Sequence, residues 1–491
     1  MSIRQIARGA IRRASPIFAS FAMVFAPLAA LAPAAAHAEN EGGPEVFIPG
    51  RPQLELESDR VSLRDLRPAP ESDPFLRVLS GPGWRMAAGL DPRLGQRAEW
   101  NTLTRMDLSG NAFSGSNAPA RQVGGVSVPF RDPAPAFSRN LLITRDFSNS
   151  PVQLEPHIAV DPKDSNHVIV GVIDYNFPGV SVYVTFDGGE TWEGPIQTRY
   201  LRDDLIAGGD PVIGFDREGN AYVIYISIGI EEFSVGRFAV SAPVSAIGIT
   251  TSKDGGLTWS DPVASARRLP FTELDPPGPD QRVRGSIMVP FLDKPWLAVG
   301  PDPQNPSRDV IHISYTEFLD VLEVLYVDEL PAFAAVEMRT TIKTVHSNDL
   351  GKTWTDAVPV SPTVTRASAG GAAPGESISQ GQQRVVQGSE PHTAPDGTLY
   401  VSWLDSTDDD SQEGLAEIYI ARSDDGGKSF GRPVRASVFN EPGFRSRTAF
   451  FRYWATAFPR LATGPGGEVY IVYGGLNPAR PVDDGDIFFL R

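Results

Sequence analysis

One octapeptide occurs four times in this chain, in slightly different forms. It reads TFDGGETW at residues 185–192, SKDGGLTW at 252–259, SNDLGKTW at 347–354 and SDDGGKSF at 423–430. Similar segments that recur along a sequence are typical of a fold built from successive units. A chain of 491 residues is long for one ordinary hydrophobic core, and a repeated unit removes that difficulty.

The repeated unit is longer than the octapeptide. A short apolar strand near a proline comes first, a second strand follows after a tight turn, a third leads into the octapeptide and a fourth leaves it. We expect the proline to be the first residue of its strand, where its missing N–H is not needed. The prolines that define this column are Pro156, Pro211, Pro295, Pro391 and Pro459. Four-stranded antiparallel units repeated along a chain predict an all-β fold, a β-propeller.

The octapeptide then lies in the hairpin between the third and fourth strands. Its Asp accepts hydrogen bonds within the turn, its Gly adopts positive φ, and its aromatic ring packs between neighbouring sheets. An EF-hand-like calcium loop needs more oxygen ligands than these stretches offer. We therefore predict structural roles for Asp187, Gly189, Trp192, Asp254, Gly256, Trp259, Asp349, Gly351, Trp354, Asp425, Gly427 and Phe430.

This octapeptide resembles the Asp-box repeat, also called the bacterial neuraminidase (BNR) repeat, of the sialidase-like propeller superfamily. The resemblance covers roughly residues 140–491. It implies that the boxes lie on the face away from the active site. It also implies a glycoside hydrolase of the exo-sialidase type, with three arginines for the substrate carboxylate, a Tyr–Glu nucleophile pair and an Asp acid/base. The family's first arginine lies in a Phe/Tyr-Arg-Ile-Pro motif, where this chain has Glu155 and His157 instead.

Long connections are expected on the face opposite the octapeptides. They are residues 229–245, 260–293, 318–338, 355–389 and 431–457. Connections of this length are more often functional than incidental. We predict that this long-loop face binds the ligand.

Residues beside the column prolines are expected at the axial mouth of that face. Three carboxylates there are candidates for acid and base at a glycosidic bond, and the alternative is that they bond to backbone N–H groups: Glu155, Asp210 and Glu390. The candidates for substrate binding are His157, Asp293, Trp296, His392, Arg445, Arg447, Arg452 and Arg460. Arginines and aromatic rings in the last connection suit stacking on a sugar or contact with an anion, and packing over the mouth is the alternative.

A run of acidic residues follows one second strand. Asp405, Asp408, Asp409 and Asp410 are either calcium ligands or a solvated acidic loop. We predict no other cofactor, because the chain has no cysteine for thiolate ligands and its histidines are scattered.

Composition and the amino-terminal segment indicate the compartment. Residues 1–38 have the arginines, apolar stretch and Ala-His-Ala site of an export signal, with Sec or twin-arginine export left open. We expect a periplasmic or extracellular protein without a transmembrane segment after cleavage. A net charge of −16 disfavours nucleic acid as a partner. The oligomeric state is left open.

The predicted domains are the signal at 1–38, a Pro/Gly-rich, weakly ordered region at 39–138 and the propeller at 139–491. Five blades are visible, and the fifth ends where another octapeptide is expected. We expect a truncated chain and six blades in the intact protein; the alternative is a five-bladed ring closed by residues 140–146. Two functions follow as hypotheses: a glycan-acting hydrolase, or a non-catalytic propeller that binds a glycan or a protein.

Overall fold

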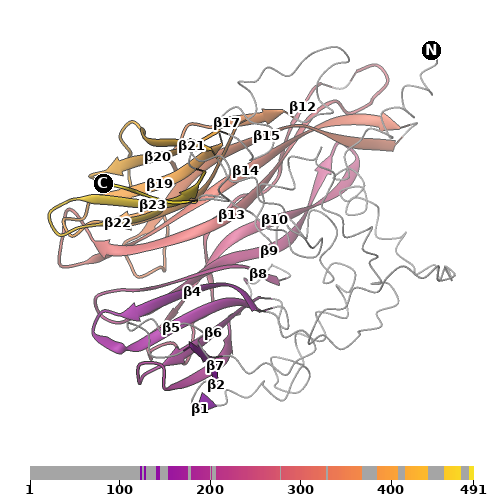
Figure 1. Ribbon diagram of the computed structural model, residues 1–491. Helices are drawn as coiled ribbons and strands as arrows, with labels where there is room; N and C mark the ends of the chain where they lie inside the picture. Colours follow the sequence, from indigo (N-terminus) through magenta and orange to yellow (C-terminus); the bar gives the residue numbers. More distant parts are fainter. Residues whose placement is uncertain are drawn as a thin grey trace, which may run out of the picture.

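The computed structural model describes residues 122–123, 126–128, 140–143, 153–174, 179–199, 201, 206–276, 278–327, 330–367, 384–406, 415–440, 458–476 and 486–491. Every regular element in this part of the chain is a β-strand. The strands form five successive antiparallel blades around a common axis, so the predicted β-propeller is confirmed (Figure 1). No helix in the described part is long and apolar enough to cross a membrane.

The first two blades follow the predicted meander. Blade 1 contains β4 (Gln153–Asp161), β5 (Asp164–Asp174), β6 (Gly179–Thr185) and β7 (Thr191–Gln197), with β1 (Gln122–Val123) paired to the edge of β7. Blade 2 contains β8 (Ile206–Phe215), β9 (Ala221–Val235), β10 (Phe238–Ser252) and β11 (Val263–Arg267).

The next three blades differ in size. Blade 3 contains β12 (Phe271–Leu274), β13 (Gly285–Pro301), β14 (Asp309–Val327), β15 (Leu330–Ser347), β16 (Val358–Pro359) and β17 (Val364–Ala367). Blade 4 contains β18 (Val385–Thr393), β19 (Leu399–Ser406), β20 (Leu415–Ser423) and β21 (Val434–Asn440). The described strands of blade 5 are β22 (Arg460–Thr463), β23 (Val469–Gly475) and β24 (Asp486–Leu490).

Residues 140–142 do not complete the fifth blade. They form β3 (Asn140–Leu142), which pairs with β2 (Val126–Val128) in a separate two-stranded sheet. Among the described strands β24 pairs only with β23. The proposed closure of the ring by this segment is therefore wrong.

All four octapeptides form the same hydrogen-bonded turn. In the third copy, Ser347 donates its hydroxyl to Asp349 Oδ1 at 2.8 Å and accepts the Gly351 N–H at 2.9 Å. The backbone N–H and hydroxyl of Thr353 reach the same carboxylate at 2.9 and 2.6 Å. The other copies repeat these four bonds. Burial opposes ionisation of Asp349, but these donors lower its pKa to about 2.

Three of the octapeptide aromatics pack between neighbouring blades, whereas Trp192 packs on Val170, Val172 and Tyr183 of its own blade 1, which corrects its predicted position. Trp259 of blade 2 packs in a core of blades 1 and 2, Trp354 between blades 2 and 3, and Phe430 between blades 3 and 4. The fifth residue of each octapeptide has φ between 83° and 94°, as predicted for the tight turn at Gly189, Gly256, Gly351 and Gly427. The octapeptides are therefore structural elements of the blade interfaces in this fold.

The column prolines do not begin their strands, which corrects the sequence-based prediction. β4, β8 and β13 start several residues earlier and contain a β-bulge at the proline. A bulge takes residues out of the ladder, so the missing proline N–H costs no bond there. In β18 the bulge instead precedes Glu390, and Pro391 stays opposite Val401.

Two of the predicted long loops are also strands. β9 and β10 pair continuously through residues 229–245, and β14 and β15 pair through 318–338. With the first half of β13 these extensions pack around a separate core that contains Val235, Val240, Ile287 and Leu322. We call the extended part of β12–β15 the wall; it projects beyond the propeller body (Figure 1). The prediction that residues 229–245 and 318–338 are loops is therefore wrong.

Candidate functional site at the propeller axis

Three neighbouring inner strands carry the same unusual backbone at one point. Glu155, Asp210 and Lys294 each precede a column proline and have φ of 49°, 51° and 50°. A left-handed conformation costs a residue with a side chain about 1–2 kcal/mol. Such backbone occurs mainly where the surrounding structure fixes a functional group. The recurrence at three strands marks this end of the axis as a candidate site.

The side chains of these three residues meet. Lys294 Nζ lies 3.0 Å from Glu155 Oε2 and 3.7 Å from Asp210 Oδ2. Asp210 is almost fully enclosed, with 2% of its side chain exposed, whereas Glu155 retains 32%. Glu155 is therefore the carboxylate of this cluster that a ligand can reach, and Asp210 lies beneath it.

Burial and neighbouring charges shift the pKa values of Asp210 and Lys294 in this cluster. Burial, followed by the charge of Glu155, raises the pKa of Asp210 well above its usual value, although Lys294 opposes the shift. Burial opposes a charge on Lys294, but Asp210 and Glu155 outweigh it and raise the lysine pKa. Buried Asp293 contributes to both shifts. Burial thus favours the protonated form of Asp210 beside an ammonium ion and a second carboxyl group.

A second group of residues joins blades 3, 4 and 5 at the axis. Arg460 Nη1 lies 3.2 Å from Glu390 Oε2, and its guanidinium covers the Trp296 ring at 3.9 Å from the centroid. His157 meets the same ring edge-on, with 5.1 Å between centroids. Burial raises the pKa of Glu390 despite the opposing charge of Arg460.

The histidines of the mouth are neutral at physiological pH. Burial, with a smaller contribution from Arg460, lowers the pKa of His157 to about 4. The His157 Nδ1 accepts the backbone N–H of Ile213 at 3.1 Å, which binds blade 1 to blade 2. Burial also lowers the pKa of His392, which lies on β18 opposite Tyr400.

Several predicted site residues are not brought into this group. Arg445, Arg447, Arg452, Asp408, Asp409 and Asp410 lie outside the described residues. Asp405 is buried at the end of β19, where Arg384 Nη2 bonds to its Oδ2. Within the described ranges no group of three or more His, Asp or Glu side chains could hold a metal ion. Calcium binding by this acidic run stays a prediction.

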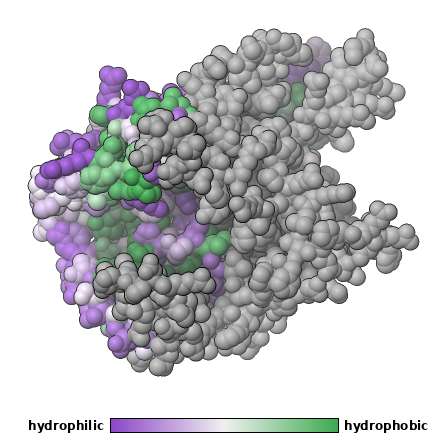
Figure 2. Space-filling model, viewed as in Figure 1, coloured by the Kyte–Doolittle hydropathy of each residue, from purple (hydrophilic) through white to green (hydrophobic). Residues whose placement is uncertain are grey.

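Lys294 is the central residue that the sequence did not single out. It was visible as the residue before Pro295, in the column that also holds Glu155 and Asp210. A basic residue in a column with three acidic ones was the available signal, because neighbouring carboxylates need a counter-ion when they are partly buried. The space-filling view shows a hollow between the lower and upper blades, lined by hydrophilic and hydrophobic residues (Figure 2).

Comparison with known proteins identifies no family. No protein-family model and no curated protein matches the chain. A Dyadobacter fermentans protein of unknown function is 15% identical with a TM-score of 0.33, covering 69% of this chain and 82% of that one. A GH43 endo-arabinanase from Bacillus licheniformis is 11% identical with a TM-score of 0.31, covering 68% and 92%. A leech intramolecular trans-sialidase is 11% identical with a TM-score of 0.30, covering 69% and 60%. Such values leave the family open.

Proposed function

We propose that this propeller is an exported protein that binds a glycan at its axis and hydrolyses a glycosidic bond there. The amino-terminal signal pattern supports a periplasmic or extracellular site of action. The resemblance of the octapeptides to the Asp box makes a sialoside one substrate to be tested. The axial residues support the hydrolytic chemistry.

Two carboxyl groups in contrasting surroundings carry this proposal. Glu155 is partly exposed and faces the Lys294 ammonium at 3.0 Å, which favours its ionised form. Glu390 has 13% of its side chain exposed, and burial raises its pKa, which favours its protonated form. Carboxyl groups whose surroundings push their protonation apart suit base and acid roles in one reaction. In this proposal Glu390 gives its proton to the leaving oxygen as the glycosidic bond breaks, and Glu155 takes a proton from the water molecule that forms the new bond to the anomeric carbon.

The remaining axial residues support these two carboxyl groups. Asp210 and Lys294 act through Glu155 as positioning residues, because Asp210 itself is enclosed. Trp296 offers an aromatic ring to a sugar, and Arg460 and His157 fix the orientation of that ring. Arg460 retains 55% exposure of its side chain and can also donate to sugar hydroxyls.

The test is turnover of a fluorogenic glycoside panel that includes an α-sialoside and an α-arabinofuranoside. Glu155→Gln and Glu390→Gln should each reduce kcat/KM by about 100-fold or more, the usual range for loss of an acid or base. Glu417→Gln is the control, because Glu417 is buried about as much as Glu390 and is ion-paired with Arg435 at 2.7 Å, but lies off the axis. Unchanged turnover in both axial variants would contradict the assignment.

A non-catalytic binding propeller is the second candidate function. The observation that favours it is that each accessible axial carboxylate already has a basic partner, Lys294 for Glu155 and Arg460 for Glu390. Such pairs could serve only to hold the blades together. Retained binding of a glycan or protein ligand with no turnover of any glycoside would select this function over the hydrolase.

A further inference from the structure

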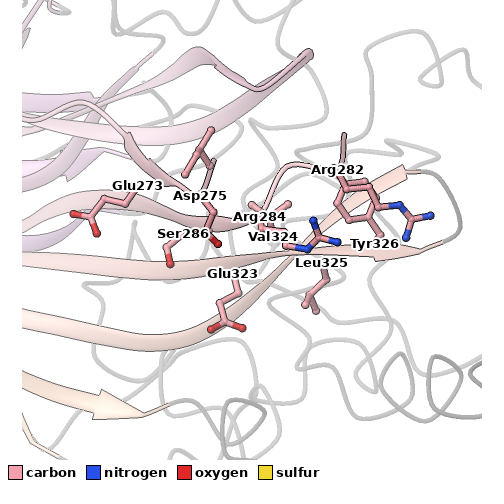
Figure 3. A pocket seen from close by; sticks show the side chains of 11 residues that line it. Glu273, Asp275, Arg282, Arg284, Ser286, Glu323, Val324, Leu325 and Tyr326 are labelled. Atoms are coloured by element: carbon pink, nitrogen blue, oxygen red, sulfur yellow. The ribbon is translucent and has the colours of Figure 1, made fainter. Parts of the chain in front are cut away.

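A second concave site lies on the wall, away from the axial residues. It is a groove of about 830 Å³ at the far end of β12, β13 and β14. Figure 3 shows its side chains, with Glu273, Ser286 and Glu323 toward one end and Arg282 and Tyr326 toward the other. The proposed hydrolytic mechanism does not use any of these residues.

Strand register places three polar groove residues on one face of the wall. Glu273, Ser286 and Glu323 are direct cross-strand neighbours on β12, β13 and β14. Alternation puts the intervening Ile287, Leu322 and Val324 on the opposite face, where they pack in the core shared with β9 and β10. Val324 and Tyr326 also line the groove although they belong to this core, so the groove lies at the end of the wall, where residues of both faces contribute to it.

The groove is connected to the axial site by one strand. Ser286 and Lys294 both lie on β13, eight residues apart, and a strand rises about 3.3 Å per residue. The two sites are therefore about 26 Å apart along the strand. Only a chain of several sugar units, or another extended polymer, can contact both at once.

The charges of the groove discriminate between polymers. Arg284 is already paired with Asp280 at 2.6 Å, and the Arg282 guanidinium lies over the Tyr326 ring at 5.0 Å. Glu273 and Glu323 are exposed and, within the described residues, have no ionic partner. Their carboxylates accept hydrogen bonds from sugar hydroxyls but repel a polyanion.

We propose that the groove is a distal subsite for a neutral polysaccharide whose other end reaches the axial site. This rests on the proposed glycan function and deepens it, because the substrate becomes an uncharged polymer rather than a terminal acidic sugar. Glu273, Ser286 and Glu323 hold sugar hydroxyls, and exposed Leu325 contacts the apolar side of the sugar ring.

The experiment measures the affinity of the full chain for soluble polysaccharides by affinity electrophoresis, and its turnover of the same polymers. The neutral polymers are xylan, arabinan and dextran, and polygalacturonate is the polyanion. The Glu273→Ala/Glu323→Ala variant should bind the preferred neutral polysaccharide about 3- to 10-fold more weakly, as expected for lost hydrogen bonds. Its turnover of a fluorogenic monosaccharide glycoside should stay unchanged. Glu232→Ala, an exposed change on β9 outside the groove, is the control.

A charge reversal sharpens the test. Glu273→Lys/Glu323→Lys should gain affinity for polygalacturonate, which the wild type binds less well than the neutral polymers. An affinity for neutral polysaccharide within twofold of wild type in the alanine variant would overturn the inference. Binding of poly-lysine in place of any polysaccharide would also overturn it, since the groove would then be a polypeptide surface.

The two proposals can fail separately. If no glycoside is turned over but the groove variants still bind polysaccharide more weakly, the hydrolase proposal fails and the distal subsite stands. If the axial glutamate variants lose turnover while the groove variants match wild type on every polymer, the hydrolase stands and the subsite fails.

Discussion

The ammonium group of Lys294 lies 3.0 Å from the Glu155 carboxylate, although the two residues are 139 positions apart in the sequence. The contact links the inner strands of blades 1 and 3. The carboxyl group of Asp210, from blade 2 between them, is 3.7 Å from the same nitrogen. One lysine therefore ties three blades together at the axis and sets the charge of the candidate site.

Removal of this ammonium is expected to destabilise the propeller and to change its pH dependence. Lys294→Met should lower the free energy of unfolding by about 2–4 kcal/mol at pH 8, because two carboxyl groups lose their counter-ion. Without Lys294 the folded pKa of Asp210 rises further, because the ammonium no longer opposes the shift. Stability is then retained at low pH and lost as pH rises, so the deficit relative to wild type should shrink at pH 5.

Urea unfolding at both pH values checks this prediction. Lys343→Met is the control, because Lys343 is similarly enclosed and bonds to Glu317 at 2.8 Å, away from the axis. The control should lose some stability but keep glycan binding and turnover. A deficit for Lys294→Met that grows between pH 8 and pH 5 would contradict the charge assignment.

Asp210 should tolerate a neutral isostere. Burial and Glu155 raise its folded pKa well above the usual value. Asp210→Asn should therefore change the free energy of unfolding by less than about 1 kcal/mol near pH 4, which is small for a buried polar site. As pH rises from there to the folded pKa, the unfolded chain releases this proton and the wild type loses stability, whereas the variant does not, so the variant should become the more stable protein. Parallel pH profiles of chemical denaturation for the two proteins would show that the pKa of Asp210 is not raised.

The repeat made the fold predictable from sequence. Each octapeptide closes its turn with local hydrogen bonds, such as Ser423 to Asp425 at 2.8 Å, and such local chemistry can be recognised in a single sequence. The proline column located Glu155, Asp210 and Glu390 on the inner strands, although the bulges at which they lie were not predicted.

Partners that depend on the assembled propeller could not be predicted. Lys294 finds Glu155, and Arg460 finds Trp296, only after separate blades are placed around the axis. The extension of β14 and β15 was also missed, because the segment between residues 318 and 338 pairs within itself and with the first half of β13, and packs on the β9–β10 hairpin of another blade. Neither relation leaves a periodic signal in the local sequence.

Leu350 offers a stabilising substitution in the third octapeptide. It has φ of 63°, where the other copies have Gly188, Gly255 and Gly426. Its side chain is 39% exposed, so little packing is lost on truncation. Leu350→Gly should raise the free energy of unfolding by about 0.5–1 kcal/mol, because the relief of left-handed strain exceeds the entropy cost of glycine.

The equivalent position in the fourth octapeptide supplies the reverse change. A Cβ at Gly426 would meet only Pro303, at 3.7 Å, so the substitution tests backbone conformation rather than a clash. Gly426→Leu should lower the melting temperature while Leu350→Gly raises it. Destabilisation by both changes would show that packing of Leu350 outweighs its strain.

His312 places a titratable group in the interface between blades 3 and 4. It is fully buried, and neither ring nitrogen has a hydrogen-bond partner among the described residues. Its ring centroid lies 5.9 Å from that of His346, and Gly427 of the fourth octapeptide packs beside its Nδ1. Burial first, and His346 second, lower its pKa to about 3, with a weaker opposing effect from Asp302.

Because the folded protein holds His312 neutral, the unfolded chain binds an additional proton below pH 6.5. Unfolding is therefore favoured as pH falls, and this one group should cost the wild type roughly 2 kcal/mol between pH 6.5 and 4.5. His312→Leu removes the titration and fills the same apolar surroundings, so its stability should be close to wild type at pH 7 and greater at pH 4.5. Urea unfolding of both proteins at the two pH values measures the difference directly. An equal stability difference at both pH values would mean that His312 is already charged, or remains neutral, in both states.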